Sequence, residues 1–300
     1  AQLDNAEKRP DAARERLAAA IKKNPGNVQA HLAMLQLRTA NGADKSEQVR
    51  LLQTAVEAAP QSAAPRLLLV ELHLRAKEPK EALTVAQQAA AALPNDFSVM
   101  DALGQAQASN GEHLLAQATF NRMTALQPRS SLPYLRLASD HLSQGDRVAA
   151  RQNLRKALEI QPGLLQAQQG LVALAMAEKK PAEALAQTRS MQKQQPKAVA
   201  GYLLEGDIHA AAKAWDKAAQ AYRAGLKEIP DSVDLAVRLH SALLSADAKA
   251  EAARFSADWL KFHPKNSVFP FYLGDRALAS NDLPTAMQQS INSPLTKPLP

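Results

Sequence analysis

The chain contains no cysteine, which removes three kinds of chemistry at once. Without thiols there are no disulfide bonds, no thiolate metal ligands and no cysteine nucleophile. The absence suits an oxidising compartment as well as a reducing one, so cysteine usage does not indicate where the protein works.

Aromatic residues are scarce as well, at 4% of the 300 residues, although 46% of the residues are apolar. The core must therefore be built largely from Ala and Leu, which indicates close and regular packing of helices. Long hydrophobic runs are also lacking. The longest apolar stretches, such as Leu67–Val70 and Ala89–Leu93, are far shorter than the roughly 18 to 20 residues that a membrane span needs. We expect no transmembrane segment in this chain, and no targeting signal is visible at its start.

The basic residues are not clustered, although the formal net charge is +7 and the pI is near 9.6. A basic chain can bind the phosphates of nucleic acids. Here the cations come as isolated pairs separated by Glu and Asp, and few aromatic side chains are present to stack on bases. These pairs are Lys22-Lys23, Arg155-Lys156 and Lys179-Lys180. The sequence therefore predicts solvated helix faces and no nucleic-acid partner.

Motifs for catalysis or cofactor binding are missing too. The chain has no Gly-rich phosphate loop, no HExxH and no GxSxG. We therefore expect a protein that is not an enzyme, with no catalytic residues, no cofactor and no metal.

What the chain does contain is a regular series of prolines. They fall at positions 25, 60, 94, 128, 162, 196, 230 and 264, with one gap of 35 residues followed by a constant 34. Proline ends a helix because it pushes the preceding residue out of the α region and cannot donate a backbone hydrogen bond. A period of 34 residues is that of the tetratricopeptide repeat (TPR), in which each unit is a helix-turn-helix pair. The series predicts an all-α TPR solenoid, a right-handed superhelix of antiparallel helix pairs, with about sixteen helices and no strands.

Other residues recur in step with the prolines; we call the first helix of each unit helix A and the second helix B. Twelve residues before a proline stands Ala, at 13, 82, 116, 150, 184, 218 and 252, with Gln48 as the exception. Nine residues after a proline stands Leu, at 69, 103, 137, 171, 239 and 273, with Glu205 as the exception. The next residue is often small, namely Gly104, Ala138, Gly206 and Gly274. We expect this small residue to lie close to the helix B alanine.

The slot that holds Trp at the start of the TPR pattern contains Leu32, Met100, Tyr134, Tyr202 and Ala236 in this chain. Asn, Asp or Ser close behind a proline is expected to begin the next helix A. Asn41-Gly42, Asn110-Gly111 and Gln144-Gly145 are expected to end helix A, because these residues tolerate the left-handed conformation. Pro79 and Pro181 suit the first turn of helix B.

These registers divide the chain into a single array, residues 1–300. Its parts are 1–27 (partial unit), 28–62, 63–96, 97–130, 131–164, 165–198, 199–232 and 233–266 (full units) and 267–300 (incomplete unit). The gap of 35 predicts one extra residue near Pro25. Residues 1–8 resemble the tail of a helix A, and Pro294 interrupts the last helix B, so we expect a piece of a longer protein.

Three histidines, His73, His141 and His209, recur at intervals of 68 residues, which is two whole units. Helices pack about 10 Å apart, so the rings are too distant to share a metal ion, which needs bonds of roughly 2 Å. We interpret these histidines as structural.

The candidate binding surface is the groove that helix A lines in TPR arrays. By register, the polar residues that face this groove include Asp101, Gln105, Arg136, Gln166, Gln169, Asp207, Asp234 and Arg238. The expected occupant is a protein or peptide.

The rings of Trp215, Trp259, Tyr134, Tyr202, Tyr222 and Tyr272 fall at or near core registers, which favours packing. A carbohydrate site would need an exposed ring beside a carboxylate. Trp215-Asp216 is the candidate pair for such a site, although Asp216 is more simply explained as the cap of a helix B.

The stretch Gln166–Asp207 is more individual than a generic TPR unit. It contains Met191-Gln-Lys-Gln-Gln-Pro196 followed by Gly201-Tyr-Leu-Leu-Glu-Gly-Asp207, and Ala218–Leu226 and Leu235–Pro264 continue the pattern. In these segments the chain resembles the TPR lipoproteins of PEP-CTERM/exosortase systems in exopolysaccharide-producing bacteria. The resemblance implies a periplasmic protein anchored to the outer membrane by a lipid, with the anchor upstream of this chain; a cytoplasmic location stays open.

The function we expect is a non-catalytic protein-protein interaction scaffold in exopolysaccharide export or PEP-CTERM protein sorting. One alternative is a carbohydrate-binding or carbohydrate-guiding TPR module of a secretion apparatus, with polysaccharide as the partner. Another is a regulatory TPR region of an enzyme whose catalytic domain lies elsewhere.

Overall fold

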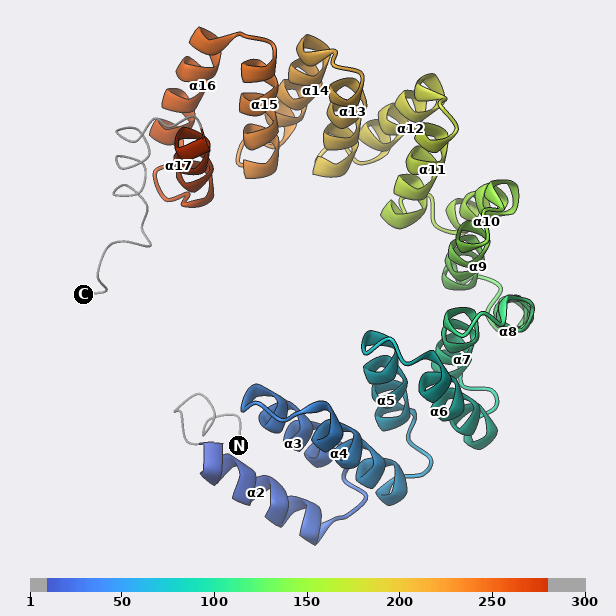
Figure 1. Cartoon of the computed structure of the whole chain (residues 1–300). Helices are drawn as coiled ribbons and strands as arrows, with labels where there is room; N and C mark the ends of the chain where they lie inside the picture. The colour runs from blue at the N-terminus through green and yellow to red at the C-terminus, as the bar shows by residue number, and fades with distance from the viewer. Residues whose placement is uncertain (1–9, 280–300) are drawn as a thin grey trace. The chain divides into compact units, whose positions relative to one another are not determined.

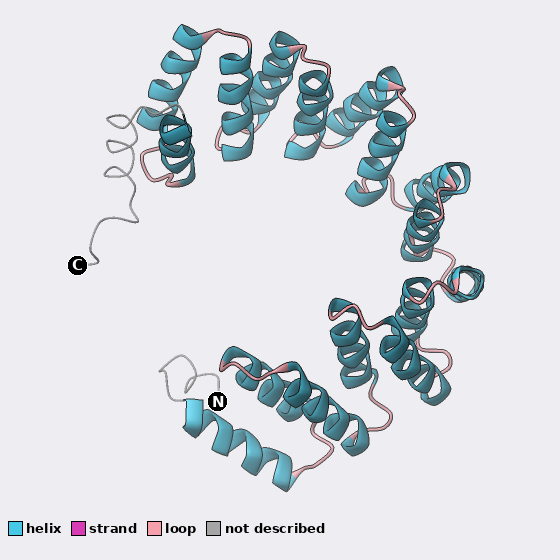
Figure 2. Ribbon diagram, in the orientation of Figure 1, coloured by secondary structure: helices cyan, strands magenta, loops and turns pink. Residues whose placement is uncertain are grey.

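A computed structural model describes residues 10–279 of the chain, which divides into two compact units, Ala1–Ile160 and Gln161–Pro300. Within the described residues the chain forms sixteen α-helices and no strand (Figures 1 and 2). The predicted all-α fold is therefore confirmed.

The helices are of nearly equal length and alternate between helix B (even numbers) and helix A (odd numbers). The first unit contains α2 (Pro10–Lys23), α3 (Val28–Ala40), α4 (Lys45–Ala58), α5 (Ala63–Arg75), α6 (Pro79–Ala92), α7 (Phe97–Ser109), α8 (His113–Leu126), α9 (Leu132–Ser143) and α10 (Arg147–Ile160). The second contains α11 (Leu165–Ala177), α12 (Pro181–Gln194), α13 (Val199–Ala211), α14 (Trp215–Glu228), α15 (Val233–Ser245), α16 (Lys249–Phe262) and α17 (Val268–Ala279).

The turns from helix B to helix A follow the prolines. Each helix B ends two residues before its proline, as α2 does before Pro25, because the proline removes the next backbone donor. Three of the polar residues behind the prolines then cap helix A as predicted. Asn27, Asp96 and Ser232 accept hydrogen bonds from the backbone N–H groups of Ala30, Val99 and Leu235 at 3.1, 3.0 and 3.5 Å.

The turns from helix A to helix B share one left-handed residue. Gly42, Gly111 and Gly145 have φ values of 84°, 83° and 78°, as the Asn-Gly and Gln-Gly pairs predict. The same position is left-handed in the other turns without glycine, at Lys77, Lys179, Lys213 and Asp247. Pro79 and Pro181 are the first residues of α6 and α12, where the missing N–H is not needed.

The alanine register forms the centre of each helix pair. Ala13, Ala82, Ala116, Ala150, Ala184, Ala218 and Ala252 are all at most 1% exposed. Gln48, the exception in this register, is half-buried, and its amide donates a hydrogen bond of 3.0 Å to the carbonyl of Ala43. The leucine register is buried at Leu69, Leu137, Leu171 and Leu239 and half-buried at Leu103 and Leu273.

At Gly104 and Gly206, the side chain nearest to the small residue after the leucine is an aromatic ring on helix B, four residues after the alanine. A Cβ atom at Gly104 would lie 2.3 Å from Cε1 of Phe120, and one at Gly206 would lie 2.1 Å from Cε1 of Tyr222. The glycines are needed because a large ring, and not a methyl group, fills the space between the two helices.

The extra residue of the 35-residue gap lies in a turn, and not near Pro25 as predicted. Residues 41–44 connect α3 to α4, whereas residues 76–78 make the equivalent connection between α5 and α6. The first helix A therefore keeps the common register, and its buried slot holds His31 (7% exposed) instead of Leu32. The ring of His31 donates a hydrogen bond of 2.8 Å to the carbonyl of Pro25.

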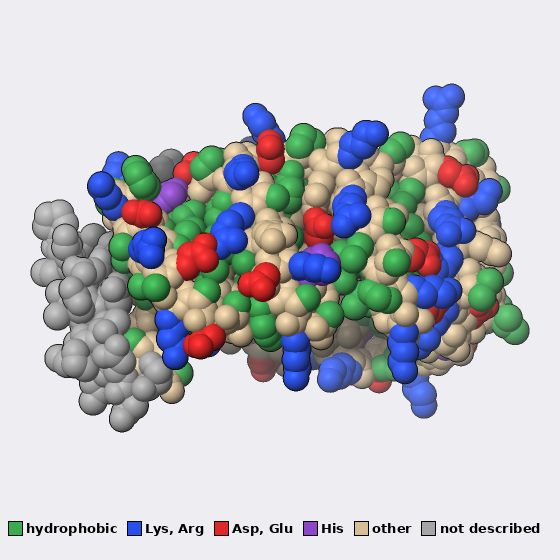
Figure 3. Space-filling view, turned by 90° about the horizontal axis from the view of Figure 1, so that it is seen from above, with side chains coloured by type: hydrophobic (Ala, Val, Ile, Leu, Met, Phe, Trp, Pro, Cys, Tyr) green, Lys and Arg blue, Asp and Glu red, His purple; other side chains and the backbone are tan. Residues whose placement is uncertain are grey.

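The expectations for residues 1–8, and for Pro294 in the last unit, lie outside the described residues. None of the helices between residues 10 and 279 combines the length and the apolar character needed to cross a membrane. On the face shown in Figure 3, basic side chains are interspersed with acidic and apolar ones.

Candidate functional site

Three of the predicted groove residues form one polar cluster in the first unit. Arg136 on α9 donates two hydrogen bonds to Asp101 on α7, from Nε to Oδ1 at 2.7 Å and from Nη2 to Oδ2 at 2.8 Å. Gln105 donates to the same carboxylate, from Nε2 to Oδ2 at 2.9 Å. Such bidentate ion pairs are stronger than single hydrogen bonds, and they fix the orientation of the guanidinium. The cluster joins two successive helix A segments and carries no net charge.

A hollow of about 310 Å³ opens beside this cluster; we call it the α7–α9 hollow. Its apolar walls come from three residues, Leu74, Ala108 and Phe120. Its polar rim consists of Gln105, Ser109, Arg136, Ser139, Asp140 and Ser143. The hollow therefore offers hydroxyl and amide groups above an apolar floor, which is the composition of many small binding pockets.

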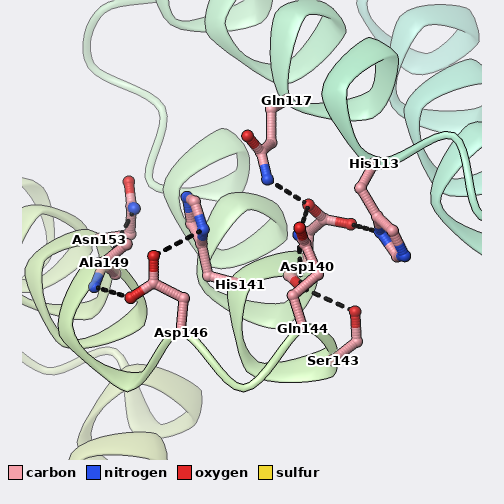
Figure 4. Close-up of polar contacts among 9 residues, drawn as sticks. All are labelled: His113, Gln117, Asp140, His141, Ser143, Gln144, Asp146, Ala149 and Asn153. Carbon is pink, nitrogen blue, oxygen red and sulfur yellow. Dashed lines mark hydrogen bonds and ion pairs between the residues drawn. The ribbon is translucent and has the colours of Figure 1, made fainter.

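A buried carboxylate, Asp140, lies at the wall of this hollow, and the sequence reasoning missed it. Its side chain is 1% exposed, and Figure 4 shows the donors around it. His113 Nδ1 donates to Oδ1 at 2.7 Å, while Gln117 and Gln144 both donate to Oδ2 at 2.8 Å. A buried carboxylate is costly unless its oxygens are hydrogen-bonded, so these donors explain how it is tolerated.

The signal for Asp140 is its register, twelve residues after a proline. Six other repeats have an apolar residue at that position, namely Leu37, Leu72, Ala106, Leu174, Ile208 and Ala242, and one has Arg276. Asp140 is the acidic residue of this mostly apolar register, and it makes a polar contact between neighbouring repeats, here between α8 and α9.

Two of the three predicted structural histidines link the end of helix A to the start of helix B. His73 Nδ1 lies 2.8 Å from Glu78 Oε2, and His141 Nδ1 lies 3.8 Å from Asp146 Oδ2. Hydrogen bonds from Lys45, and then from His73, hold the pKa of Glu78 below its usual range. His209 has Ala214 at the equivalent position, and burial lowers the pKa of its imidazole. Among the described residues, no group of His, Asp and Glu is arranged to hold a metal ion.

In the second unit, two of the predicted groove residues lie near each other, Asp207 on α13 and Arg238 on α15. The hydroxyl of Tyr222 on α14 donates to Oδ1 of Asp207 at 2.7 Å, and Nη1 of Arg238 lies 3.7 Å from the same oxygen. Burial, and then the hydrogen bond to Asp207, raises the pKa of Tyr222, so the phenol stays protonated and acts as a donor.

The other predicted groove residues of this unit are exposed on their helices: Gln166 and Gln169 on α11, and Asp234 on α15. The structure does not bring these three into the cluster around Asp207. Their role as groove residues stays a prediction.

The aromatic residues are divided between core and surface. Tyr202, Tyr222 and Trp259 are buried at 6%, 2% and 5% exposure, which confirms packing for these rings. Trp215, which the sequence places at or near a core register, is half-buried and is the first residue of α14. The prediction that Asp216 caps this helix is wrong, because the cap is Ala214 and Asp216 lies inside the first turn.

Comparisons with known proteins agree with this architecture. Models of the tetratricopeptide repeat family match residues 49–108 and 168–233. The crystal structure of yeast Tom70 is similar with a TM-score of 0.60 at 15% identity, over 97% of this chain and 61% of Tom70. A tetratricopeptide repeat protein from Parabacteroides merdae gives a TM-score of 0.54 at 16% identity, over 80% of this chain and 94% of that protein.

The APC/C hetero-tetramer Cut9–Hcn1 gives a TM-score of 0.48 at 17% identity, over 88% of this chain and 54% of the matched chain. This chain therefore spans less than two thirds of Tom70 and of that matched chain. Among curated proteins, no sequence relative matches. The family matches and the helix pairs show that the chain contains TPR repeats, and the structural likeness at these identities concerns the fold alone.

Proposed function

We propose that this chain is a non-catalytic scaffold that binds segments of partner proteins on its helix A faces. The observation that carries the proposal is the α7–α9 hollow, which lies beside the three clustered groove residues. TPR repeats are in general protein-binding modules, and such arrays offer extended binding surfaces.

The charges at this site favour an uncharged segment of the partner. Asp101 is neutralised by Arg136, and both oxygens of Asp140 already accept hydrogen bonds from the protein. A charged side chain entering the hollow would lose its hydration without finding an opposite charge that is free to pair. A peptide backbone or a neutral polar side chain can instead exchange hydrogen bonds with Ser109, Ser139 and Ser143, which line the rim.

The biological setting we propose is the bacterial periplasm, in exopolysaccharide export or PEP-CTERM protein sorting. Support comes from the resemblance of Gln166–Asp207 to the TPR lipoproteins of those systems. In this proposal the full-length protein is anchored to the outer membrane by a lipid upstream of residue 1. Fractionation of cells that express the full-length protein tests the location: recovery with the outer membrane is expected, and recovery with the cytoplasm would contradict it.

The binding surface can be tested by filling the hollow. Ser139 is exposed on α9 and lines the hollow, so Ser139→Trp should block a partner without disturbing the core. Lys156→Trp places the same ring on an exposed site of α10 and serves as the control. We expect proteins captured by the unmodified chain from the source organism's envelope to be retained by Lys156→Trp and lost by Ser139→Trp. Retention of every partner by both variants would refute binding at this hollow.

A further inference from the structure

Trp215 stands in a slot where the repeat does not require a large ring. It is the first residue of α14 and is half-buried. The first residue of the other complete helix B segments from α4 onwards is basic (Lys45, His113, Arg147 and Lys249) or proline (Pro79 and Pro181). Elsewhere the fold is made with a Lys, Arg, His or Pro at this position, so the repeat does not require the large indole ring.

The ring lines a hollow of about 480 Å³ in the second unit; we call it the Trp215 hollow. The turn between α13 and α14 and the turn between α15 and α16 form its walls. The lining residues are Lys213, Ala214, Trp215, Asp216, Lys217, Ser245, Ala246 and Asp247. An aromatic face, two carboxylates, two ammonium groups and a hydroxyl thus surround one small space.

The other tryptophan of the chain shows what a structural ring looks like in this protein. Trp259 is 5% exposed, and it stacks on His263 with the ring centroids 3.9 Å apart. It also lies 5.6 Å from Phe269, centroid to centroid, in the core between α15, α16 and α17. Trp215 belongs to no such cluster among the described residues, and its neighbours in the hollow are mostly polar.

The charges around the Trp215 hollow nearly balance. Lys249 Nζ lies 3.3 Å from Asp247 Oδ1, so one carboxylate is already partly neutralised. Lys213, Asp216 and Lys217 are all exposed on the other side. A strongly charged ligand of either sign would meet like charge within the hollow. A neutral ligand with many hydroxyl groups meets acceptors in the carboxylates and donors in the ammonium groups.

We propose that the Trp215 hollow binds one pyranose unit of a saccharide. The apolar face of the sugar ring would lie on the indole, since a flat aromatic surface buries C–H groups at little conformational cost. Sugar hydroxyls would donate to Asp216 and Asp247 and accept from Lys213 and Lys217. The volume of about 480 Å³ is that of a small-molecule pocket. The inference is independent of the proposed protein binding, because the two hollows lie in different units.

Calorimetric titration of the full chain tests this site with three hexasaccharides: a neutral β-1,4-glucan, an N-acetylated chitin fragment and an anionic polymannuronate. We expect saturable binding of at least one of the two neutral saccharides, and weaker binding of the anionic one because Asp216 and Asp247 repel it. Trp215→Ala should weaken the binding of the neutral saccharide about tenfold, the equivalent of about 1.4 kcal/mol, and Asp247→Asn should weaken it to a smaller extent. Trp215→Phe keeps an aromatic face and should retain most of the affinity.

Phe262→Ala is the matched control, because Phe262 is a 71% exposed ring of the same unit outside the hollow. Its affinity should equal that of the unmodified chain. Absence of saturable binding to both neutral saccharides overturns the proposal, as does equal binding by Trp215→Ala. If Trp215→Ala does not fold, either of two results overturns the proposal. One is unchanged affinity in Asp247→Asn, and the other is loss of binding in Phe262→Ala. Blocking the α7–α9 hollow with Ser139→Trp should leave saccharide binding unchanged.

Discussion

Seven turn residues between helix A and helix B have a left-handed backbone, and four of them are not glycine. A Cβ atom in this region clashes with the neighbouring backbone at a cost of roughly 1–2 kcal/mol. Lys77, Lys179, Lys213 and Asp247 therefore carry local strain that Gly42, Gly111 and Gly145 avoid. The array keeps one turn geometry in every unit even where the local sequence opposes it.

The strain can be measured by placing alanine at the left-handed position of two turns, one that has glycine there and one that does not. Gly111→Ala adds a Cβ to a left-handed residue, and apart from the adjoining residues no heavy atom lies within 4 Å of that Cβ, so only the backbone penalty applies. We expect a loss of about 1 kcal/mol in the free energy of unfolding, measured by urea denaturation. Lys179→Ala at the same register is the control and should cost much less, because the penalty is already present there. Equal losses at both turns would show that the Cβ is not the cause.

His240 makes the stability of the second unit depend on pH. The residue is 6% exposed, and burial, followed by repulsion from Arg276, lowers its pKa to about 4. An imidazole in the unfolded chain titrates at about 6.5. Between these values the unfolded state binds more protons, so the contribution of His240 is complete above pH 6.5 and is lost as the pH falls to 4.

We expect the urea midpoint of the unmodified chain to fall between pH 7 and pH 4.5. His240→Gln, which does not titrate, should flatten this dependence while lowering the midpoint at pH 7. Burial also lowers the pKa of His209, which is half-buried, so this residue acts in the same direction and leaves a residual slope. An unchanged slope in His240→Gln would show that this side chain is not the sensor.

At the scale of the helix pair, the size of a side chain on helix A is matched to the size of the side chain that faces it on helix B. Gly104 and Gly206 face the rings of Phe120 and Tyr222. The equivalent positions in residues 131–164 are Ala138 and Leu154, which are 1% and 4% exposed. A larger residue on helix A thus accompanies a smaller one on helix B, so close packing is kept while the individual residues change.

This matching predicts a rescue between two substitutions. Gly104→Ala should cost about 1–3 kcal/mol, because its Cβ would lie 2.3 Å from the ring of Phe120. Adding Phe120→Leu copies the Ala138 and Leu154 pair, and the double variant should lose less than the sum of the single losses. Thermal or urea melting of all four proteins gives the coupling energy. Purely additive losses would show that the two side chains do not interact.

The proline series predicts the helix ends well, because the mechanism is local. A proline ends the preceding helix wherever it stands, and the capping residues that follow act over three residues. The register argument fails where one residue is inserted. The gap of 35 shows that an extra residue exists, but only the structure places it in the turn at residues 41–44, which moves the buried slot from Leu32 to His31.

Contacts between neighbouring repeats do not follow from the repeat pattern, because the pattern contains only what the repeats have in common. The donors to Asp140 lie on α8 and at the C-cap of α9, and neither the pairing nor the burial follows from spacing. The repeat register places Trp215 at or near the core, whereas its position as the first residue of α14 puts it beside a hollow. Of the eight predicted groove residues, the structure joins Asp101, Gln105 and Arg136 in one cluster and Asp207 and Arg238 in another.

At the scale of the whole molecule, a repeat array differs from a globular domain because its contacts are local in sequence. Stability is then approximately the sum of terms for each repeat and for neighbouring interfaces, so damage to one repeat need not spread to the others. Tryptophan fluorescence can be used to test this property, because it reports on one of the two compact units. Trp215 and Trp259 are its two tryptophans, and both belong to the second unit.

A substitution in the first unit should therefore separate two optical signals. Ala150 is fully buried between α9 and α10, so Ala150→Leu overpacks this helix pair and should cost about 1–3 kcal/mol. In a urea titration, part of the circular dichroism signal, which reports on all the helices, should be lost at a lower urea concentration than in the unmodified chain. The midpoint of the tryptophan fluorescence transition, which reports on the second unit, should not change. Lys156→Leu on the exposed face of α10 is the control and should change stability by less than about 0.5 kcal/mol. If both signals shift together after Ala150→Leu, the chain unfolds as one cooperative body, and the description by local terms fails for this protein.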